Sequence, residues 1–166
     1  MAFTFAYSLD GTGLAAQDFD LTAAGTYTPA FADVVRFDAN GKIVAKHVVG
    51  DSASSKLGVS VGTNFTGLAQ GGTYAATTVS TYNPSTIGKV YTDPNAVYRV
   101  NITSATAIVV GTSYGIATVS GDQQLDPSAT ASNNRFMVVD FDRTAAAGAP
   151  FGWAFVTIQS ANRLFG

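Results

Sequence analysis

Residues Thr81–Val100 have the sequence TYNPSTIGKVYTDPNAVYRV. Two turn signals, Asn83–Ser85 and Asp93–Asn95, divide this stretch into three short runs, because Asn, Asp, Pro and Ser favour tight turns. The runs carry Val, Ile, Thr and Tyr, which are enriched in strands. No arrangement of catalytic groups is visible in the stretch. It therefore predicts short strands joined by tight turns, and a building element rather than a reaction centre.

The composition of the whole chain favours the same kind of structure. The chain has 166 residues, including 17 Gly, and its 11 acidic residues are all Asp. Glu is a helix former, whereas Asp hydrogen-bonds its own backbone in turns. We therefore expect an all-β protein, an antiparallel β-sandwich or barrel, with no long α-helix.

Alternation and turn residues place the individual strands. The clearest hairpin pairs Asp33–Phe37 with Lys42–Val49, because Asn40-Gly41 supplies the positive φ angles of a tight turn. Asp122–Asn134 is expected to be a polar loop. The other expected strands are Phe3–Tyr7, Gln17–Leu21, Leu57–Gly62, Asn64–Leu68, Thr73–Tyr82, Lys89–Tyr91, Ala96–Ile102, Ala105–Val110, Ser113–Ser120, Arg135–Asp142 and Gly152–Gln159.

The length fits a single domain over residues 1–166, which can bury a sizeable core. Turn signals at Thr92–Asn95 and Asp142–Gly148 suggest a lobe of residues 91–143 inserted into a first sheet. Such a lobe would be a small barrel-like unit closed by Val97–Ile102 and Phe136–Phe141. A single undivided domain is the alternative.

The charge of the chain is low and dispersed. Only 12% of the residues are charged, the net charge is −2, and the nine basic residues are scattered. Nucleic-acid binding requires clustered cations, so we expect no nucleic-acid partner. Interface centres are depleted of charge, so the composition favours assembly with other subunits; a monomer with a bland surface is the alternative.

Several classes of site and location are disfavoured by what the sequence lacks. Without Cys there is no disulfide or thiolate metal site. The first residues, Met1–Gly11, do not have the basic and apolar regions of a signal peptide. No apolar stretch approaches the roughly 20 residues that span a bilayer, so we expect no membrane partner.

Two glycine patterns resemble motifs of enzymes, and we expect neither to be one. Gly58–Gly62 has the G-x-S-x-G spacing of a hydrolase nucleophile, but Thr63–Gly67 cannot begin the helix that this motif requires. The one histidine, His47, precedes the serine, which is not the hydrolase order. Gly11–Ala16 is similar to a dinucleotide loop, but residues 17–25 alternate like a strand.

Two carboxylate pairs are candidate cation ligands. Asp18 with Asp20, and Asp140 with Asp142, are two residues apart on expected strands, and such pairs hold Ca²⁺ when loop carbonyls complete the shell. No dense acidic loop accompanies them, and a solvated strand face is the alternative. We expect no catalytic residue, no cofactor, no metal and no enzymatic activity.

Aromatic residues at the N-terminal end are the candidate partner contacts. Phe3, Phe5 and Tyr7 alternate with smaller residues and give one strand an aromatic face. Such a strand can add to the sheet edge of a neighbouring subunit. Packing in the protein's own core and stacking on a sugar ring are the other interpretations.

Five blocks of the sequence together resemble virion structural proteins of marine tailed phages of the cyanophage type. Their order and spacing agree with that family over residues 33–142, whereas residues 63–80 are richer in Gly and Thr. The blocks are Asp33–Phe37 with its hairpin to Lys42–Lys46, Leu57–Gly62 leading to Phe65, Tyr82–Pro84, Tyr91–Val100, and Arg135–Val139.

The resemblance implies a capsid-associated protein, a head decoration or cement protein without catalytic residues. We expect it on the outer head surface of the virion, after synthesis in the host bacterial cytoplasm. Its expected partners are the major capsid protein and copies of itself, with a trimer at the local three-fold positions as the expected geometry.

Two other classes stay open. A phage tail or fibre component shares the β-rich, low-charge composition, although neither internal repeats nor a trimeric stalk signature is present. A carbohydrate-binding module would expose two or three aromatic residues on one sheet face. The one tryptophan, Trp153, lies in a regular alternating run that suggests burial.

Overall fold

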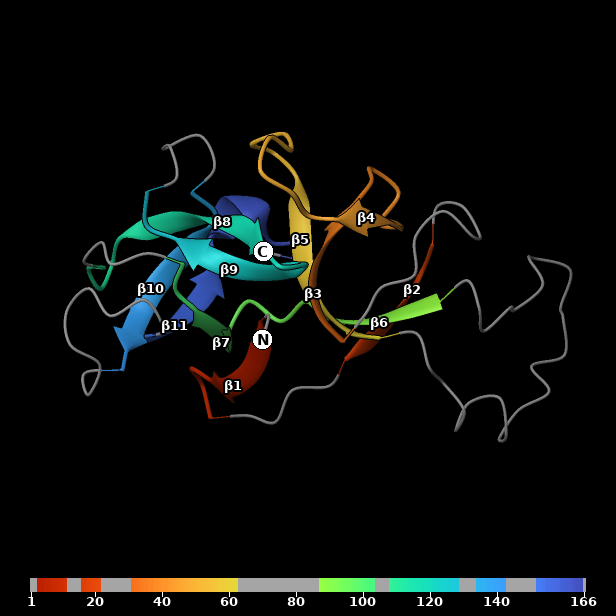
Figure 1. Ribbon diagram of the computed structural model, residues 1–166. Coiled ribbons are helices and arrows are strands. Elements are labelled where there is room, and N and C mark those ends of the chain that lie inside the picture. The colour runs from red at the N-terminus through yellow and green to blue at the C-terminus, as the bar shows by residue number, and fades with distance from the viewer. Residues whose placement is uncertain are drawn as a thin grey trace, which may run out of the picture.

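The computed structural model describes residues 3–11, 16–21, 31–62, 87–103, 108–128, 134–142 and 152–165. Within these ranges the chain forms eleven strands and one short 3-10 helix, η3 (Ser160–Asn162), and no α-helix. The named strands pair antiparallel throughout, in two sheets (Figure 1). The prediction of an all-β sandwich or barrel is confirmed.

The two sheets mix early and late parts of the chain. The six-stranded sheet has the order β1 (Thr4–Ser8), β7 (Ala96–Asn101), β11 (Trp153–Ile158), β10 (Phe136–Phe141), β8 (Ser113–Val119), β9 (Asp122–Asp126). The five-stranded sheet has the order β2 (Gln17–Asp20), β6 (Ile87–Tyr91), β5 (Lys56–Gly62), β3 (Phe31–Phe37), β4 (Ile43–Lys46).

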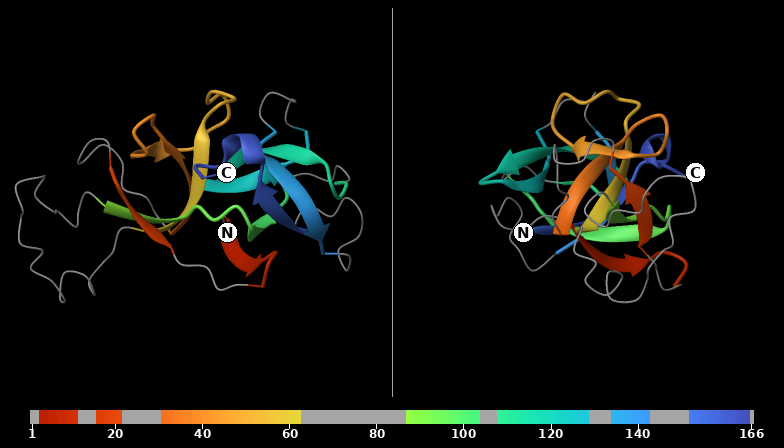
Figure 2. Two further views of the ribbon diagram at one scale, coloured as in Figure 1. Left: turned by 180° about the vertical axis from the view of Figure 1, so that it is seen from behind. Right: turned by 90° about the vertical axis from the view of Figure 1, so that its right-hand side faces the viewer.

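Both sheets curl until distant strands meet. In the six-stranded sheet, Ile102 just after β7 forms a bridge with Leu125 of β9, and Thr103 N donates to Leu125 O at 2.9 Å. In the five-stranded sheet, Leu21 just after β2 forms a bridge with Ile43 of β4. The curled sheets lie side by side, with β3 and β5 at their junction (Figure 2).

The turn in the stretch Thr81–Val100 carries the chain from one sheet to the other. β6 ends at Tyr91 in the five-stranded sheet, and β7 begins at Ala96 in the six-stranded sheet. Between them the Asp93 carboxylate accepts from Asn95 N at 2.7 Å, and Asp93 O accepts from Ala96 N at 3.1 Å. The predicted Asp-Pro-Asn turn is therefore present, whereas residues 81–86 lie outside the described ranges.

Strand β3 is buried on both faces because two cores flank it. Neighbouring strand residues point to opposite faces, and Val34 and Val35 are both fully buried. Val34 belongs to the main core between the sheets, and Val35 to a smaller core enclosed by the five-stranded sheet. The main core includes Phe3, Val34, Leu57, Val59, Tyr98, Val100, Ile116, Leu125, Phe136, Val138 and Val156; the smaller one is Leu21, Val35, Phe37, Ile43 and Val90.

Strand β5 shares this position and alternates in the same way. Leu57 and Val59 face the main core. Gly58 faces the smaller core, where a Cβ atom would lie 2.4 Å from Val90 Cγ1 and 2.9 Å from Tyr91 O. Glycine therefore lets β6 approach β5 closely.

Turn chemistry accounts for both described hairpins. At the predicted hairpin β3–β4, Gly41 has φ 75°, and the Asp38 carboxylate accepts from Asn40 N and Lys42 N. At the hairpin β8–β9, Ser120 and Gly121 have φ 52° and 87°, which is the pattern of a two-residue hairpin turn.

Two sequence-based expectations are wrong. Asp122–Asn134 is not wholly a loop, because its first residues form β9, with Gln123 and Leu125 buried in alternation. Ala105–Val110 is not a strand in its described part, because residues 108–110 lead into a turn closed by Thr112 N donating to Val109 O at 3.1 Å. The expected strands Asn64–Leu68 and Thr73–Tyr82 lie outside the described residues.

The expected lobe of residues 91–143 contains four strands of the six-stranded sheet, and that sheet also includes strands from outside these residues. Strands β7, β8, β9 and β10 lie in the six-stranded sheet, and β11 pairs with both β7 and β10. The two strands expected to close the lobe are thus joined through β11. The division of the chain into a domain with an inserted lobe stays a prediction.

Gly58→Ala tests the close approach of β5 and β6. The added methyl group meets Val90 and the Tyr91 carbonyl, and overpacking of this kind costs about 1–3 kcal/mol. We expect chemical denaturation to show a free energy of unfolding lowered by that amount. Thr118→Ala on the exposed part of β8 is the control and is expected to unfold like the parent; equal stability of Gly58→Ala would contradict the close packing.

Candidate functional site

The structure places the three predicted contact residues of β1 in three different environments. Phe3, just before β1, is fully buried, and its ring centroid lies 4.7 Å from that of Phe136. Phe5 is half-buried, 5.3 Å from the ring of Tyr91. Tyr7 is 42% exposed. Phe3 and Phe5 therefore pack within the chain, and Tyr7 is the member of the trio that a partner can reach.

A bulge in β1 separates Tyr7 from the other two rings. Phe5 lies opposite Tyr98, Tyr7 lies opposite Val97, and the register shifts between Phe5 and Tyr7. One extra residue reverses the alternation of side chains, so Tyr7 points to the outer face, away from the main core. Among the described residues β1 pairs with β7 alone, so it is an edge strand. Its role in partner contact stays a prediction.

The outer face of the six-stranded sheet carries a group of large side chains. On β11, Ala154 and Val156 belong to the main core, so Trp153 and Phe155 point outward. The Arg99 guanidinium carbon of β7 lies 3.7 Å from the centroid of the Trp153 ring. Trp153 is half-buried, so the expectation that it is buried holds only in part, because the larger residues of β11 face outward and the smaller ones fill the core.

These side chains surround a hollow. Arg99, Asp142, Trp153 and Phe155 line a volume of about 390 Å³. Tyr7 borders the group, with its ring centroid 6.0 Å from that of Phe155. The outer face therefore presents aromatic rings, a cation and a carboxylate at one place.

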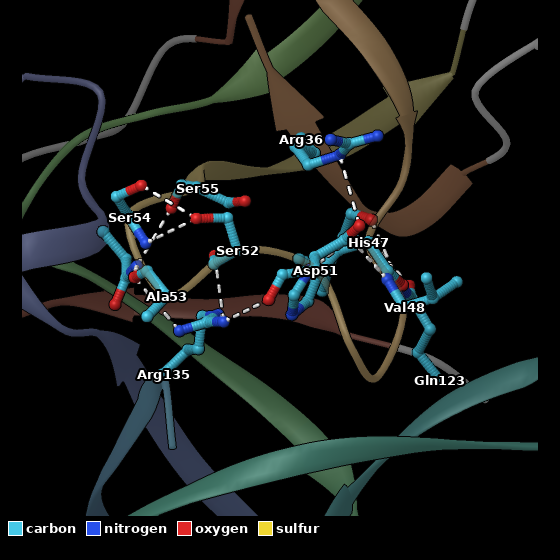
Figure 3. A network of polar contacts seen from close by, with 12 residues as sticks. Arg36, His47, Val48, Asp51, Ser52, Ala53, Ser54, Ser55, Gln123 and Arg135 are labelled. Atoms are coloured by element: carbon cyan, nitrogen blue, oxygen red, sulfur yellow. Dashed lines mark hydrogen bonds and ion pairs between the residues drawn. The ribbon is translucent and has the colours of Figure 1, made fainter. Parts of the chain in front are cut away.

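A second polar arrangement lies between the two sheets, at the loop that joins β4 to β5 (Figure 3). The buried Arg135, just before β10, donates from Nη2 to Asp51 O at 2.8 Å and Ser52 O at 3.0 Å, and from Nη1 to Ala53 O at 3.1 Å. Asn162 of η3 donates to Ala53 O at 2.8 Å and Ser55 O at 2.9 Å. Side chains of the late part of the chain thus hold an early loop by its carbonyls.

The other end of this loop is fixed by His47 and Gln123. His47 Nδ1 lies 2.9 Å from Asp51 Oδ2, which also accepts from Val48 N. Gln123 of β9 is fully buried, accepts from Val34 N at 2.6 Å, and donates to Val34 O and to His47 O. Gln123 thereby extends the hydrogen bonding of β3 across to β9.

Burial governs the ionisation of His47. Its side chain is enclosed, and desolvation lowers its pKa below the ordinary value, although the hydrogen bond and charge of Asp51 oppose this shift. The cations Arg135 and Arg36 add to the lowering, and Arg36 Nε lies 3.5 Å from the second Asp51 oxygen. His47 is therefore neutral at pH 7 and donates to the Asp51 carboxylate through Nδ1.

Of the motifs that resemble chemistry, Gly58–Gly62 lies in a strand, whereas most of Gly11–Ala16 lies outside the described residues. Ser60 is buried inside β5, which continues to Gly62 without turning into a helix, so it does not have the geometry of a nucleophile elbow. Asp18 forms an ion pair with Lys89 at 3.3 Å, and Asp140 accepts from Phe141 N. Within the described ranges no three His or Asp side chains are grouped as metal ligands.

The sequence did not predict the hollow on the outer face or the polar contacts around the β4–β5 loop, because the residues that form each of them are far apart in the chain. Arg135 and Ala53 are separated by 82 positions, and no local pattern connects them. The alternation in β11 could have indicated the hollow. Ala154, Val156 and Ile158 belong to the aliphatic core, so the residues that alternate with them, Trp153 and Phe155, face outward.

The chain matches no known protein-family model, no curated protein and no solved structure. In the part of the chain that the structure describes, no helix is long and apolar enough to cross a membrane. Fold and surface define an all-β protein built of two antiparallel curled sheets.

Arg135→Met tests the bonding between the sheets. Methionine keeps most of the apolar stem but removes every donor, so three loop carbonyls lose charged hydrogen bonds. A bond of this type contributes about 1.5–3 kcal/mol, and we expect the free energy of unfolding to fall by at least that much. Lys42→Met at the exposed β3–β4 turn is the control. An Arg135→Met protein that melts like the control would show that the bonds to the loop contribute nothing.

The lowered pKa of His47 predicts a loss of stability in mild acid. The unfolded state takes up a proton near pH 6.5, whereas the folded state resists it. The free energy of unfolding is therefore not reduced by His47 above this pH. Below it, the free energy of unfolding falls by at most about 1.4 kcal/mol per pH unit for one proton. Denaturation between about pH 7 and pH 5 measures the slope, before most Asp residues titrate.

His47→Asn removes the titrating group and keeps a donor near Asp51, so its stability is expected to be flat over the same pH range. Because the chain has one His and no Cys, the assignment of the slope is direct. An equal slope in the parent and the variant would contradict it.

Proposed function

We propose that the protein is a non-enzymatic structural component of a virion, a decoration or cement protein that binds the outer surface of an icosahedral phage head. It clamps neighbouring subunits of the major capsid protein and stabilises the lattice. Its own copies associate as trimers at the local three-fold positions, where three capsomers meet.

The observation that carries this proposal is the edge strand β1 on a rigid β body. β1 pairs with β7 along one side only among the described strands, and its residue Tyr7 is exposed. A strand with an open edge can add to another sheet through main-chain hydrogen bonds. The partner thus receives an ordered strand and does not have to order a flexible segment.

Rigidity and low charge support the same function. Two cores and the polar contacts of Arg135 and Gln123 fix the sheets to each other. A stiff body that binds the assembled lattice better than free subunits stabilises the lattice by linkage. Only 12% of the residues are charged, which reduces the desolvation cost of burying the surface against a neighbour.

Purified virions of the phage that encodes the chain test the proposed function. We expect hundreds of copies per particle by quantitative mass spectrometry and density for this fold on the head in cryo-electron microscopy. Heads that lack the protein should break at lower temperature and under milder osmotic shock than complete heads. A protein found only in the tail, or in a dozen copies or fewer, would be a tail component and the proposal would be wrong.

Tyr7→Lys tests the docking surface. Tyr7 and Val119 are each 42% exposed, so Val119→Lys on β8 is a matched control. We expect Tyr7→Lys to weaken binding to heads that lack the protein about tenfold, or by about 1.4 kcal/mol, with an unchanged melting temperature. Val119→Lys should bind like the parent. Equal binding by all three proteins would exclude the outer face of β1 from the contact.

A further inference from the structure

The hollow on the outer face of the six-stranded sheet is built from adjacent strands. Phe155 of β11 lies directly opposite Arg99 of β7 in the pairing register, and Arg99 stacks over Trp153, two residues from Phe155. Asp142 is held beside the same ring, since its backbone N–H donates to Trp153 O at 2.8 Å. The described lining side chains are therefore placed by backbone hydrogen bonds between adjacent strands.

The polarity of the lining restricts the ligand. Arg99 is donor-only and cationic, Asp142 is acceptor-only when ionised, and both line the hollow with Trp153 and Phe155. An anion would meet the Asp142 carboxylate, and a cation would meet the Arg99 guanidinium. A purely apolar ligand would cover the Arg99 guanidinium without accepting a hydrogen bond from it, which is costly.

A neutral sugar ring satisfies all of these groups. Its hydroxyl groups both donate and accept, so neighbouring hydroxyls can receive from Arg99 and give to Asp142. Its C–H face is apolar and fits against the ring of Phe155, which Tyr7 flanks at a centroid distance of 6.0 Å. The volume of about 390 Å³ lies at the lower end of the range for small-ligand pockets, about 300–1,000 Å³.

We propose that this hollow, lined by Arg99, Asp142, Trp153 and Phe155, is a binding site for a neutral hexopyranose unit of a glycan. Phe155 provides the surface for the apolar face of the sugar, and Arg99 and Asp142 hold its hydroxyls. Trp153 lies beneath Arg99 and keeps the guanidinium in place. This site gives the protein a ligand of its own, in addition to any contact with a shell.

The single tryptophan makes the test specific, because Trp153 is the only one in the chain and lines the hollow. The full-length protein is titrated with methyl glucoside, methyl galactoside, methyl mannoside and N-acetylglucosamine while tryptophan fluorescence is recorded. We expect a saturable change with at least one of these sugars at millimolar concentration. Glucuronate, glucosamine and the apolar alcohol cyclohexanol are expected to bind at least about tenfold more weakly than that sugar, a difference of about 1.4 kcal/mol.

Substitutions separate a sugar site from a general effect on fluorescence. Phe155→Leu keeps an apolar side chain but removes the ring, and we expect affinity to fall about tenfold, or by about 1.4 kcal/mol. Asp142→Asn removes the charge, so the affinity for glucuronate should rise severalfold. Phe165→Ala is the control, because this exposed ring lines a different hollow with Gln17 and Pro94.

The outcomes are decisive because the free protein is used and no virion is needed. Saturable binding of a neutral sugar that Phe155→Leu weakens and Phe165→Ala preserves supports the proposal, whether or not the protein decorates a capsid. A signal that does not respond to any neutral sugar overturns it. So does a response that charged sugars share equally, or that Phe155→Leu leaves unchanged in a variant with the parent's melting temperature.

Discussion

Strands β3 and β5 bury both of their faces, and the rest of the molecule is arranged around that requirement. Val34 and Val35 are adjacent and fully buried, so apolar material must lie on each side of one sheet. The five-stranded sheet curls to cover one side, and the six-stranded sheet with Phe3 covers the other. Each core therefore depends on the same two strands.

Strands β3 and β5 separate the two cores, and the loop that leads into β5 has backbone carbonyl groups that need hydrogen-bond donors. The loop from β4 to β5 must turn beside both cores, and buried carbonyl groups without donors are costly. Arg135 and Asn162 supply those donors, and Gln123 bonds to both the N–H and the C=O of Val34. The polar network therefore follows from the apolar packing, and it also connects the two sheets.

The sequence predicts what local chemistry controls. The β3–β4 hairpin, the turn at Asp93–Asn95 and the strand β7 depend on neighbouring residues, and these predictions are confirmed. β9 escaped prediction because Gln123, a polar residue, occupies a core position that only its distant partners Val34 and His47 make favourable. Trp153 is only half-buried because it lies on the outer face of β11, and alternation defines two faces without saying which one is covered.

The predicted aromatic face of β1 also shows that alternation alone does not determine which side chains are buried. A single bulge, invisible in the alternating pattern, separates Tyr7 from Phe3 and Phe5. It leaves Phe3 in the core and brings Tyr7 beside Phe155 on the outer face. The edge strand and the aromatic hollow are thus neighbours on one surface, and a subunit docked along β1 would border the hollow.

The burial of both faces of β3 and β5 also has a consequence during translation. Val34, Leu57 and Val59 leave the ribosome long before their partners Phe136, Val138 and Val156. At about 5–20 residues per second, the interval lasts several seconds. During that time the nascent half exposes apolar surface to water, and transiently exposed apolar surface is prone to aggregation. The packing on both faces that stiffens the finished protein therefore leaves apolar surface exposed on the incomplete chain until β11 has been synthesised.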